Sequence, residues 1–215
     1  MMTEGKGSAK MFVLAITGGV ASGKSLFTRL FAQITGDATK CFDCDQVVHA
    51  LLDDETILEG VKNIFGQAVI SHEGKLDRKA LRERVFNSEA DRIALQDLLH
   101  PRVLRQVEAF IASSASQDES LDYVMIEVPL LYEVDFSLQR DTDVVVATSA
   151  EVQLKRLRED RGLSDEVIEQ ILKAQLPIED KISRAHQVIW NDGSEAELIE
   201  QAHLLKAWID KKVGE

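Results

Sequence analysis

The feature that most constrains this chain is the segment Gly-Gly-Val-Ala-Ser-Gly-Lys-Ser at residues 18–25, directly after the apolar run 12–17. The fixed positions of the pattern G-x-x-x-x-G-K-[ST] are occupied by Gly18, Gly23, Lys24 and Ser25. The run before them predicts a buried strand, and the apolar residues that recur after them predict a helix with one buried face. Such a strand, loop and helix start direct backbone N–H groups and the positive end of a helix dipole at one anion. The segment therefore predicts a phosphate-binding loop.

The loop also predicts the ligand and its metal. We expect the Lys24 side chain to reach the β- and γ-phosphates of a nucleoside triphosphate, and the Ser25 hydroxyl to ligate Mg²⁺. The residues expected to contact the nucleotide are Gly18, Gly19, Ala21, Ser22, Gly23, Lys24, Ser25 and Leu26.

Composition limits the class of protein. The 215 residues are 45% hydrophobic, enough to bury a core, and the formal net charge is −12. That charge argues against broad nucleic-acid binding, which needs a positive surface. No apolar run approaches the roughly 18 residues of a membrane span, and residues 1–10 lack the apolar stretch of a signal peptide. We expect a cytoplasmic protein with no nucleic-acid or membrane partner.

Strand signals recur at 12–17, 39–43, 123–128, 143–147 and 187–190, separated by helical patterns. Most of these runs are continuously apolar, as in parallel strands covered on both faces. The pattern predicts an α/β fold with a five-stranded parallel sheet flanked by helices. Pro101 suits the first turn of a helix that begins there.

Two segments are predicted to stand apart from the nucleotide-binding core, which we assign to 11–46, 114–152 and 185–214. The segment 47–113 is helical and too long for one crossover, so we expect a substrate-binding insertion. The segment 153–184 is rich in arginine, including Arg156 and Arg161, and is expected to close over the triphosphate as a helical lid. The alternative for this lid segment is an exposed surface with ion pairs at i,i+4 spacing, such as Lys155 with Glu159.

Three carboxylates and one histidine are candidates for chemistry. Asp43 and Asp45 follow the second strand, and ligands bind beyond the carboxyl ends of such strands. Alternating side chains along a strand would point both to one side, with Asp45 as the base and Asp43 supporting the metal; the alternative is that they cap the next helix. Glu127 ends the third strand, where a carboxylate holds Mg²⁺-bound water. His100, before Pro101, has either a functional role or the more usual role of a lone histidine as a helix cap or satisfied polar group.

Cys41 and Cys44 form a C-x-x-C pair. A redox pair would need a helix N-terminus under the first thiol, and a structural zinc site usually needs four ligands. We therefore expect reduced structural cysteines.

Several stretches, in this order and spacing, resemble the dephospho-coenzyme A kinase family. They are Ile-Thr-Gly-Gly-Val-Ala-Ser-Gly-Lys-Ser, Phe-Asp-Cys-Asp, Leu-Leu-His-Pro, Glu-Val-Pro-Leu-Leu-Tyr-Glu and Gln-Leu-Lys-Arg-Leu. The resemblance implies a P-loop NTPase fold and ATP-dependent phosphorylation of the ribose 3′-hydroxyl of dephospho-coenzyme A. It places the catalytic carboxylate on Asp45, His100 in the coenzyme-binding insertion, and Arg156 and Arg161 at lid and nucleotide positions.

Some positions depart from this family pattern. Ala21 stands where glycine is frequent, and Leu26 stands where threonine usually follows the serine, so Ser25 alone would serve Mg²⁺. Near the C-terminus, Ala-His-Gln-Val-Ile-Trp-Asn at 185–191 replaces Ala-Asp-x-x-Ile-x-Asn. This leaves the adenine contacts of that region open.

Three rival functions are weighed against this one. The nearest is another small-molecule kinase, of the shikimate or gluconate type. The long insertion and the His-Pro element argue against that type. A GTP-binding switch protein would need Asn-Lys-x-Asp and Asp-x-x-Gly, and the sequence has neither. A non-catalytic nucleotide-binding module would function without Asp45. We expect a monomer, and an oligomer stays open.

Overall fold

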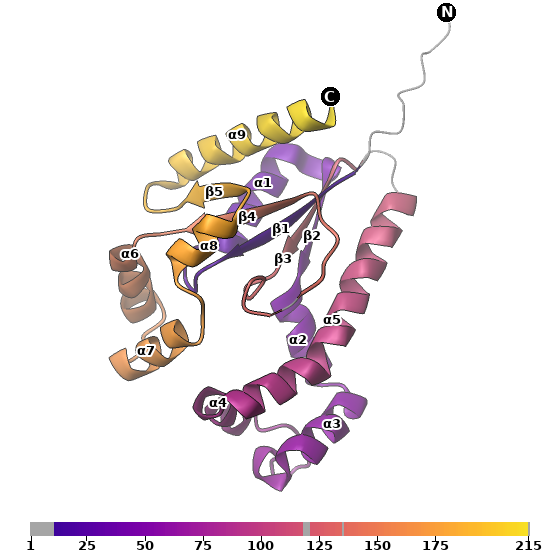
Figure 1. Ribbon diagram of the computed structural model, residues 1–215, viewed down its shortest axis with the longest axis vertical. Coiled ribbons are helices and arrows are strands. Elements are labelled where there is room, and N and C mark those ends of the chain that lie inside the picture. Colours follow the sequence, from indigo (N-terminus) through magenta and orange to yellow (C-terminus); the bar gives the residue numbers. More distant parts are fainter. Residues whose placement is uncertain (1–10, 118–120, 135, 215) are drawn as a thin grey trace, which may run out of the picture. The chain divides into compact units, whose positions relative to one another are not determined.

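A computed structural model describes residues 11–117, 121–134 and 136–214 (Figure 1). Its sheet has the strand order β2-β3-β1-β4-β5. The strands are β1 (Phe12–Gly18), β2 (Thr39–Asp43), β3 (Tyr123–Glu127), β4 (Thr142–Ala147) and β5 (Gln187–Trp190). Strand β1 pairs in parallel with β3 and β4, and β4 pairs in parallel with β5. The predicted five-stranded parallel α/β sheet is confirmed.

Helices separate the strands, as the periodicity predicts. Their bounds are α1 (Lys24–Thr35), α2 (Cys44–Leu51), α3 (Glu55–Phe65), α4 (Arg78–Asn87), α5 (Glu89–Gln117), α6 (Ala150–Lys155), α7 (Asp165–Lys173), α8 (Ile178–Arg184) and α9 (Glu195–Val213). A π-helical turn, Arg156–Asp160, continues α6, and 3₁₀ turns occupy Gly36–Ala38 and Gln67–Val69. Among the described residues, no helix has the length and apolar character that crossing a bilayer requires.

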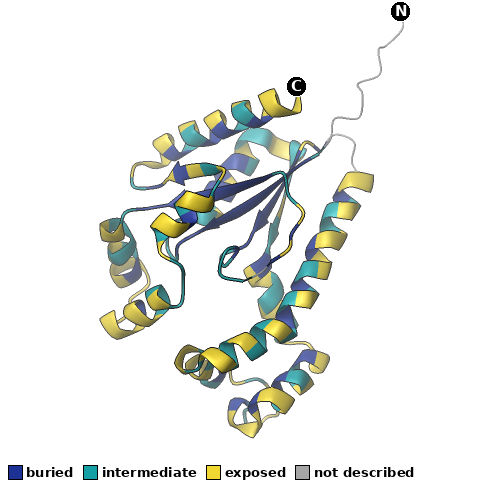
Figure 2. Ribbon diagram, viewed as in Figure 1, coloured by how far each residue is buried: buried dark blue, intermediate teal, exposed yellow. Residues whose placement is uncertain are grey.

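The chain divides into two compact units. One unit runs to Phe42 and resumes at Ala109, and the other is Asp43–Glu108. The sequence prediction places the helical insertion at 47–113. Each unit has a hydrophobic core of its own, as the buried residues in Figure 2 show.

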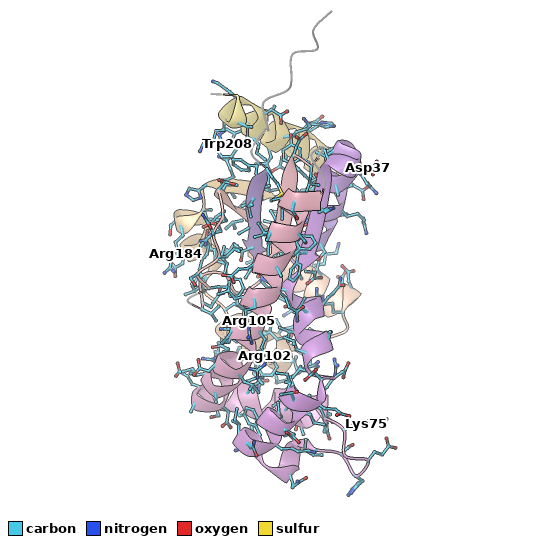
Figure 3. All side chains as sticks on the ribbon, turned by 90° about the vertical axis from the view of Figure 1, so that its right-hand side faces the viewer. Asp37, Lys75, Arg102, Arg105, Arg184 and Trp208 are labelled. Atoms are coloured by element: carbon cyan, nitrogen blue, oxygen red, sulfur yellow. The ribbon has the colours of Figure 1, made fainter. Side chains whose placement is uncertain are left out.

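The core of the larger unit lies where the sheet meets two helices. All seven residues of β1 are buried, which suits a central strand covered on both faces. Helices α1 and α9 pack together against the sheet, and they contribute Phe27, Phe31, Leu205 and Ile209 to this core. Trp208 of α9 meets the ring of Phe12 edge-on at 6.4 Å between centroids (Figure 3).

The unit Asp43–Glu108 is helical and packs around α3. Ile57, Val61 and Phe65 recur along one face of α3 and are all buried. The Asp77 side chain accepts hydrogen bonds from the N–H groups of Lys79 and Ala80, so it caps α4.

The expectation that a helix begins at Pro101 is wrong, because α5 runs through this residue without a break. A proline inside a helix removes one backbone hydrogen bond, here the one to the carbonyl four residues earlier. Two arginines, both labelled in Figure 3, bond carbonyls at and before the proline: Arg102 Nη1 donates to Leu98 O at 2.7 Å, and Arg105 Nε donates to Pro101 O at 3.2 Å.

Candidate active site

The segment between β1 and α1 is a loop whose carbonyl oxygens are all held by donors of the protein. Lys24 Nζ donates to Gly19 O at 2.9 Å and to Gly18 O at 3.4 Å. The donors to the next three carbonyls are Gln153 Nε2 on Val20 O (2.8 Å), Arg156 Nη1 on Ala21 O (3.3 Å) and Asn191 Nδ2 on Ser22 O (2.8 Å). Because the C=O and N–H bonds of a trans peptide point in opposite directions, fixing the carbonyls also fixes the direction of the amides.

Helix α1 starts at the end of this loop, and no side chain in the described part of the chain caps it. Its N-cap residue is Gly23, so no side-chain oxygen satisfies the first N–H groups of the helix. These N–H groups and the helix dipole together suit a bound anion. The local structure is that of a phosphate-binding loop.

Two of the loop glycines are required by their surroundings. A Cβ atom on Gly18 would lie 2.1 Å from Val146 O, and one on Gly23 would lie 2.1 Å from Asn191 Nδ2. Both residues also have positive φ values, 147° and 89°, that side chains rarely adopt. The neighbouring strand β4 and the residue after β5 therefore press directly against the loop backbone.

Ala21 is the only non-glycine residue with a positive φ in the described part of the chain, at 57°. This left-handed conformation costs an L-residue roughly 1–2 kcal/mol. The position where the sequence departs from the family pattern is thus a strained one. The methyl group leaves the carbonyl of Ala21 free to accept from Arg156.

We expect Ala21→Gly to raise the free energy of unfolding by about 0.5–1 kcal/mol, since relief of this strain exceeds the added freedom of glycine in the unfolded chain. Chemical denaturation measures the change. Ala207→Gly, on an exposed turn inside α9, is the matched control and should lower stability by about 1 kcal/mol. Equal losses in both variants would contradict the strain at Ala21.

Ser25 and Glu127, two of the three predicted metal ligands, lie together. Ser25 Oγ donates to Glu127 Oε2 at 2.8 Å. Ser25 belongs to the first turn of α1, and Glu127 is the last residue of β3 and is buried. A hydroxyl and a carboxylate are hard oxygen ligands of the kind that Mg²⁺ takes. Magnesium needs only one or two such protein ligands when phosphates and water complete its shell.

The lid segment contributes side chains to the loop, but unequally. Arg156 is half-buried, and besides Ala21 O it donates from Nη2 to Asn191 O at 2.8 Å. Arg161, the other predicted arginine, is exposed. The predicted pair Lys155–Glu159 is present at 4.0 Å on the surface. The charged segment therefore combines a solvated face with one arginine turned onto the phosphate loop.

Two glutamines hold a single residue of the loop from both sides. Gln153 Nε2 donates to Val20 O at 2.8 Å, and Val20 N donates to Gln175 Oε1 at 3.0 Å. Sequence reasoning missed Gln175 and Asn191 as loop contacts. For Asn191 a signal exists, because it directly follows the carboxyl end of β5, the edge where the loop lies.

Asp43 and Asp45 lie in the smaller unit, at the start of α2. Strand β2 ends at Asp43, so the expected strand alternation does not place Asp45, which is in the first turn of α2 and exposed. The Asp43 carboxylate caps this helix: Oδ1 accepts from the N–H groups of Asp45 (2.8 Å) and Gln46 (3.2 Å). The capping alternative therefore holds for Asp43, and Asp45 is not the residue whose side chain caps α2.

His100 lies within α5, one residue before Pro101. Burial lowers the pKa of its imidazole below the usual value, and the charge of Asp97 opposes this shift. The ring is therefore neutral at pH 7, and one of its nitrogens donates while the other accepts.

The departures from the family pattern near the C-terminus have local roles. His186 Nδ1 accepts a hydrogen bond from the N–H of Asp143 at 3.0 Å, which ties the start of β5 to β4. Trp190 is exposed, and its Nε1 donates to Asp192 Oδ2 at 2.9 Å. Burial acts to raise the pKa of Asp192, but hydrogen bonds from Thr148, Ser149 and Trp190 outweigh it and lower that pKa.

Neither cysteine is in a disulfide, and Cys41 is exposed whereas Cys44 is buried. Among the described residues, no group of three or more His, Cys, Asp or Glu side chains is arranged to hold a metal ion. Leu26 is half-buried and packs against the core of the larger unit.

Known proteins share this arrangement along nearly the whole chain. A family model for dephospho-CoA kinase matches residues 12–197. The chain belongs to the dephospho-CoA kinase family. A dephospho-CoA kinase of Bacillus cereus is 32% identical over 202 residues, which are 91% of this chain and 96% of that protein. A crystal structure from Thermus thermophilus is 32% identical, with a TM-score of 0.75 over 94% of this chain and 97% of that one.

The rival kinase type shares the fold alone. A shikimate kinase of Acinetobacter baumannii, solved with shikimate, is 16% identical, with a TM-score of 0.54 over 95% of this chain and 96% of that one. The fold is therefore that of the P-loop kinases, and the sequence likeness supports the dephospho-CoA kinase family and not the shikimate type.

Proposed function

We propose that this chain transfers the γ-phosphoryl group of ATP to the 3′-hydroxyl of the ribose of dephospho-coenzyme A, giving coenzyme A and ADP. The observation that carries the proposal is the family match over residues 12–197, which spans the phosphate loop, the helical unit and the lid segment. A match to the family model in the loop alone would indicate a nucleotide site and would say nothing about the acceptor.

ATP would lie on the loop from Gly18 to Leu26, with Gly19, Ala21, Ser22 and Gly23 offering backbone contacts. Phosphoryl transfer needs charge on the transferred group to be neutralised and the reactants to be held in line. We assign the neutralising positive charges to Lys24 and Arg156, both of which contact the loop backbone. Arg161 is proposed as a further nucleotide contact, from the exposed end of the same lid segment.

Magnesium would be held by Ser25 and Glu127, and we propose Asp43 as a supporting carboxylate. When bound at these residues, Mg²⁺ would offset the negative charge of the phosphate groups of ATP. The protein's part is to keep the Ser25 hydroxyl and the Glu127 carboxylate together at the start of α1.

We expect Glu127→Gln to raise the Mg²⁺ concentration for half-maximal activity at least about tenfold, because an amide oxygen replaces a carboxylate near a divalent cation. A titration of activity against Mg²⁺ at fixed ATP measures it. Glu151→Gln, on the exposed face of α6, is the control. An unchanged Mg²⁺ dependence would remove Glu127 from the metal site.

The acceptor would be oriented by the helical insertion. Asp45, an exposed residue in the first turn of α2, is proposed to receive the proton of the 3′-hydroxyl as that oxygen attacks the γ-phosphorus. His100, neutral at pH 7, is proposed as a hydrogen-bonding contact to dephospho-coenzyme A. The lid segment 153–184 would then exclude water, which otherwise competes as the phosphoryl acceptor.

We further propose that the protein acts in the cytoplasm as a monomer, with small-molecule substrates and without nucleic-acid or membrane partners. The net charge of −12 supports the part of this proposal that concerns nucleic acid. Light scattering across a concentration series tests the monomer.

The test of function is an ADP-forming assay with dephospho-coenzyme A, shikimate and gluconate offered separately and in competition. ADP release that depends on dephospho-coenzyme A is the expected result. Release that depends only on shikimate or gluconate would overturn the proposed acceptor and leave a kinase of another type.

A further inference from the structure

Helix α8, in the lid segment, turns one charged side chain inward. Lys181 is its only buried residue, at 0% exposure, whereas Glu179, Asp180 and Arg184 are exposed. Fully buried lysines are rare, because the ammonium loses its hydration and needs a partner for each proton. The site described above gives this lysine no part in phosphoryl transfer.

The Lys181 ammonium has three protons and meets three acceptors. Its Nζ lies 2.6 Å from Glu133 Oε1, 3.2 Å from Pro129 O and 3.3 Å from Gly18 O. One acceptor is the first carbonyl of the phosphate loop, and the other two belong to the segment that follows β3. A single side chain of the lid segment thus joins the ends of two neighbouring central strands.

Glu133 holds the same helix at a second point. Its Oε1 also accepts a hydrogen bond from the N–H of Leu176 at 3.0 Å, just before Pro177 and the start of α8. The other oxygen, Oε2, is buried and has no hydrogen-bond partner among the described residues. The Glu133 carboxylate therefore contacts this region at two points: the N–H of Leu176, just before α8 begins, and the ammonium of Lys181, one turn inside the helix.

Stability alone does not account for a buried ion pair. Replacing such a pair with apolar side chains of similar volume is often neutral or stabilising, because the desolvation of two charges offsets their attraction. An apolar residue at position 181 would fill the same space. It would lack the one property that the ammonium adds, which is a fixed direction for the carbonyl groups that it contacts.

That direction matters most at Gly18. This residue ends β1, begins the loop and has a φ of 147°. Its carbonyl accepts from both Lys181 (3.3 Å) and Lys24 (3.4 Å), the lysine proposed to contact the phosphates. Pro129 O, another acceptor of Lys181, also accepts a hydrogen bond from the Thr17 hydroxyl at 3.2 Å. Lys181 therefore sets the plane of the first loop peptide and ties the end of β1 to the turn after β3.

We propose that Lys181, with Glu133 as its counter-charge, is a positioning residue for the phosphoryl donor. It fixes the first peptide of the phosphate loop and joins that peptide to helix α8 of the lid segment. The inference rests on the proposed function only in taking ATP as the ligand of the loop. It assigns neither residue a contact with a substrate.

Three variants and two separate Michaelis constants test this. Lys181→Met keeps the length of the side chain and removes its donors, so we expect the KM for ATP to rise about tenfold to a hundredfold, the effect of losing a charge-assisted hydrogen bond. The KM for dephospho-coenzyme A should stay within about twofold. The double variant Lys181→Met with Glu133→Gln removes the buried unpaired carboxylate, so its Tm should recover towards wild type while its KM for ATP stays raised.

The control is Lys173→Met in α7, whose exposed ion pair with Glu169 spans 2.6 Å and which should leave both KM values and Tm unchanged. A wild-type KM for ATP in Lys181→Met, whatever its Tm, would overturn the inference, as would an equal rise in both KM values. If Lys181→Met does not fold, the double variant carries the same comparison. Calorimetric titration of each variant with ATP alone measures ATP affinity without any acceptor. A wrong acceptor assignment would instead appear as a wild-type protein that does not turn over dephospho-coenzyme A, so the two failures are distinguishable.

Discussion

Asp45→Asn is expected to lower kcat by about 10²–10⁴-fold while the affinity for ATP stays close to that of the wild type. Asparagine keeps the size and one oxygen of the side chain, but it cannot accept the proton of an attacking hydroxyl. The loop proposed to bind ATP lies in the other compact unit of the chain and does not include Asp45. Steady-state kcat with dephospho-coenzyme A, paired with calorimetric titration of ATP, measures both quantities.

Asp54→Asn is the matched control for this variant. Asp54 is an exposed aspartate of the same unit that caps α3 through the N–H groups of Thr56 and Ile57, and asparagine caps a helix about as well. Its kcat should not change. Wild-type turnover in Asp45→Asn would remove Asp45 as the base.

Arg156→Ala is expected to lower kcat by about 10²–10³-fold and to weaken ATP binding much less. A guanidinium that meets the γ-phosphoryl group acts mainly on charge that develops in the transition state. The position favours this role, because Arg156 lies on the loop carbonyl of Ala21 and on Asn191 O, half-buried against the phosphate site. Comparison of kcat with KM for ATP separates transition-state contacts from uniform binding.

Two neighbouring arginines serve as comparisons for the effect of Arg156→Ala on kcat. Arg158→Ala removes an exposed ion pair with Asp165 (2.7 Å) and should leave kcat unchanged. Arg161→Ala, at the exposed position proposed as a nucleotide contact, should have an effect between the other two. A rise in KM for ATP without loss of kcat in Arg156→Ala would make it a binding contact and not a stabiliser of the transition state.

Most of the sheet and the loop could be predicted, because local sequence determines them. A buried parallel strand such as β1 needs a continuous apolar run, and the loop needs glycine where Val146 O and Asn191 Nδ2 leave no room for a Cβ atom. Ser25 and Glu127 are each expected to ligate Mg²⁺, and the strand order of the structure brings them together, since the carboxyl ends of the neighbouring parallel strands β1 and β3 meet at one edge.

The sequence predictions that failed concern short segments whose local sequence is compatible with two structures. Strand β2 ends at Asp43, as predicted, but α2 begins at the next residue, so the strand alternation extended to place Asp45 does not apply there. At Pro101, arginine donors bond helix carbonyls around a proline that by itself favours a helix start. Hydrophobic periodicity reports neither the capping hydrogen bonds of Asp43 nor the continuation of α5 through a proline.

The role of Lys181 could not be predicted for a different reason. Its acceptors on Pro129 and Gly18 are 52 and 163 residues away in sequence, so no local pattern connects them. A lysine in the charged helix α8 is the ordinary composition of a surface, and only the fold shows that this one faces inward.

The most direct test of the central claim is the position of the phosphoryl group in the product. Wild-type protein is incubated with Mg²⁺–ATP and dephospho-coenzyme A, and the product is examined by mass spectrometry and phosphorus NMR. The account predicts one added phosphomonoester, on the 3′-oxygen of the ribose, formed in equal amount with ADP. ADP formed without a phosphorylated acceptor, or a phosphoryl group at any other oxygen, would contradict it.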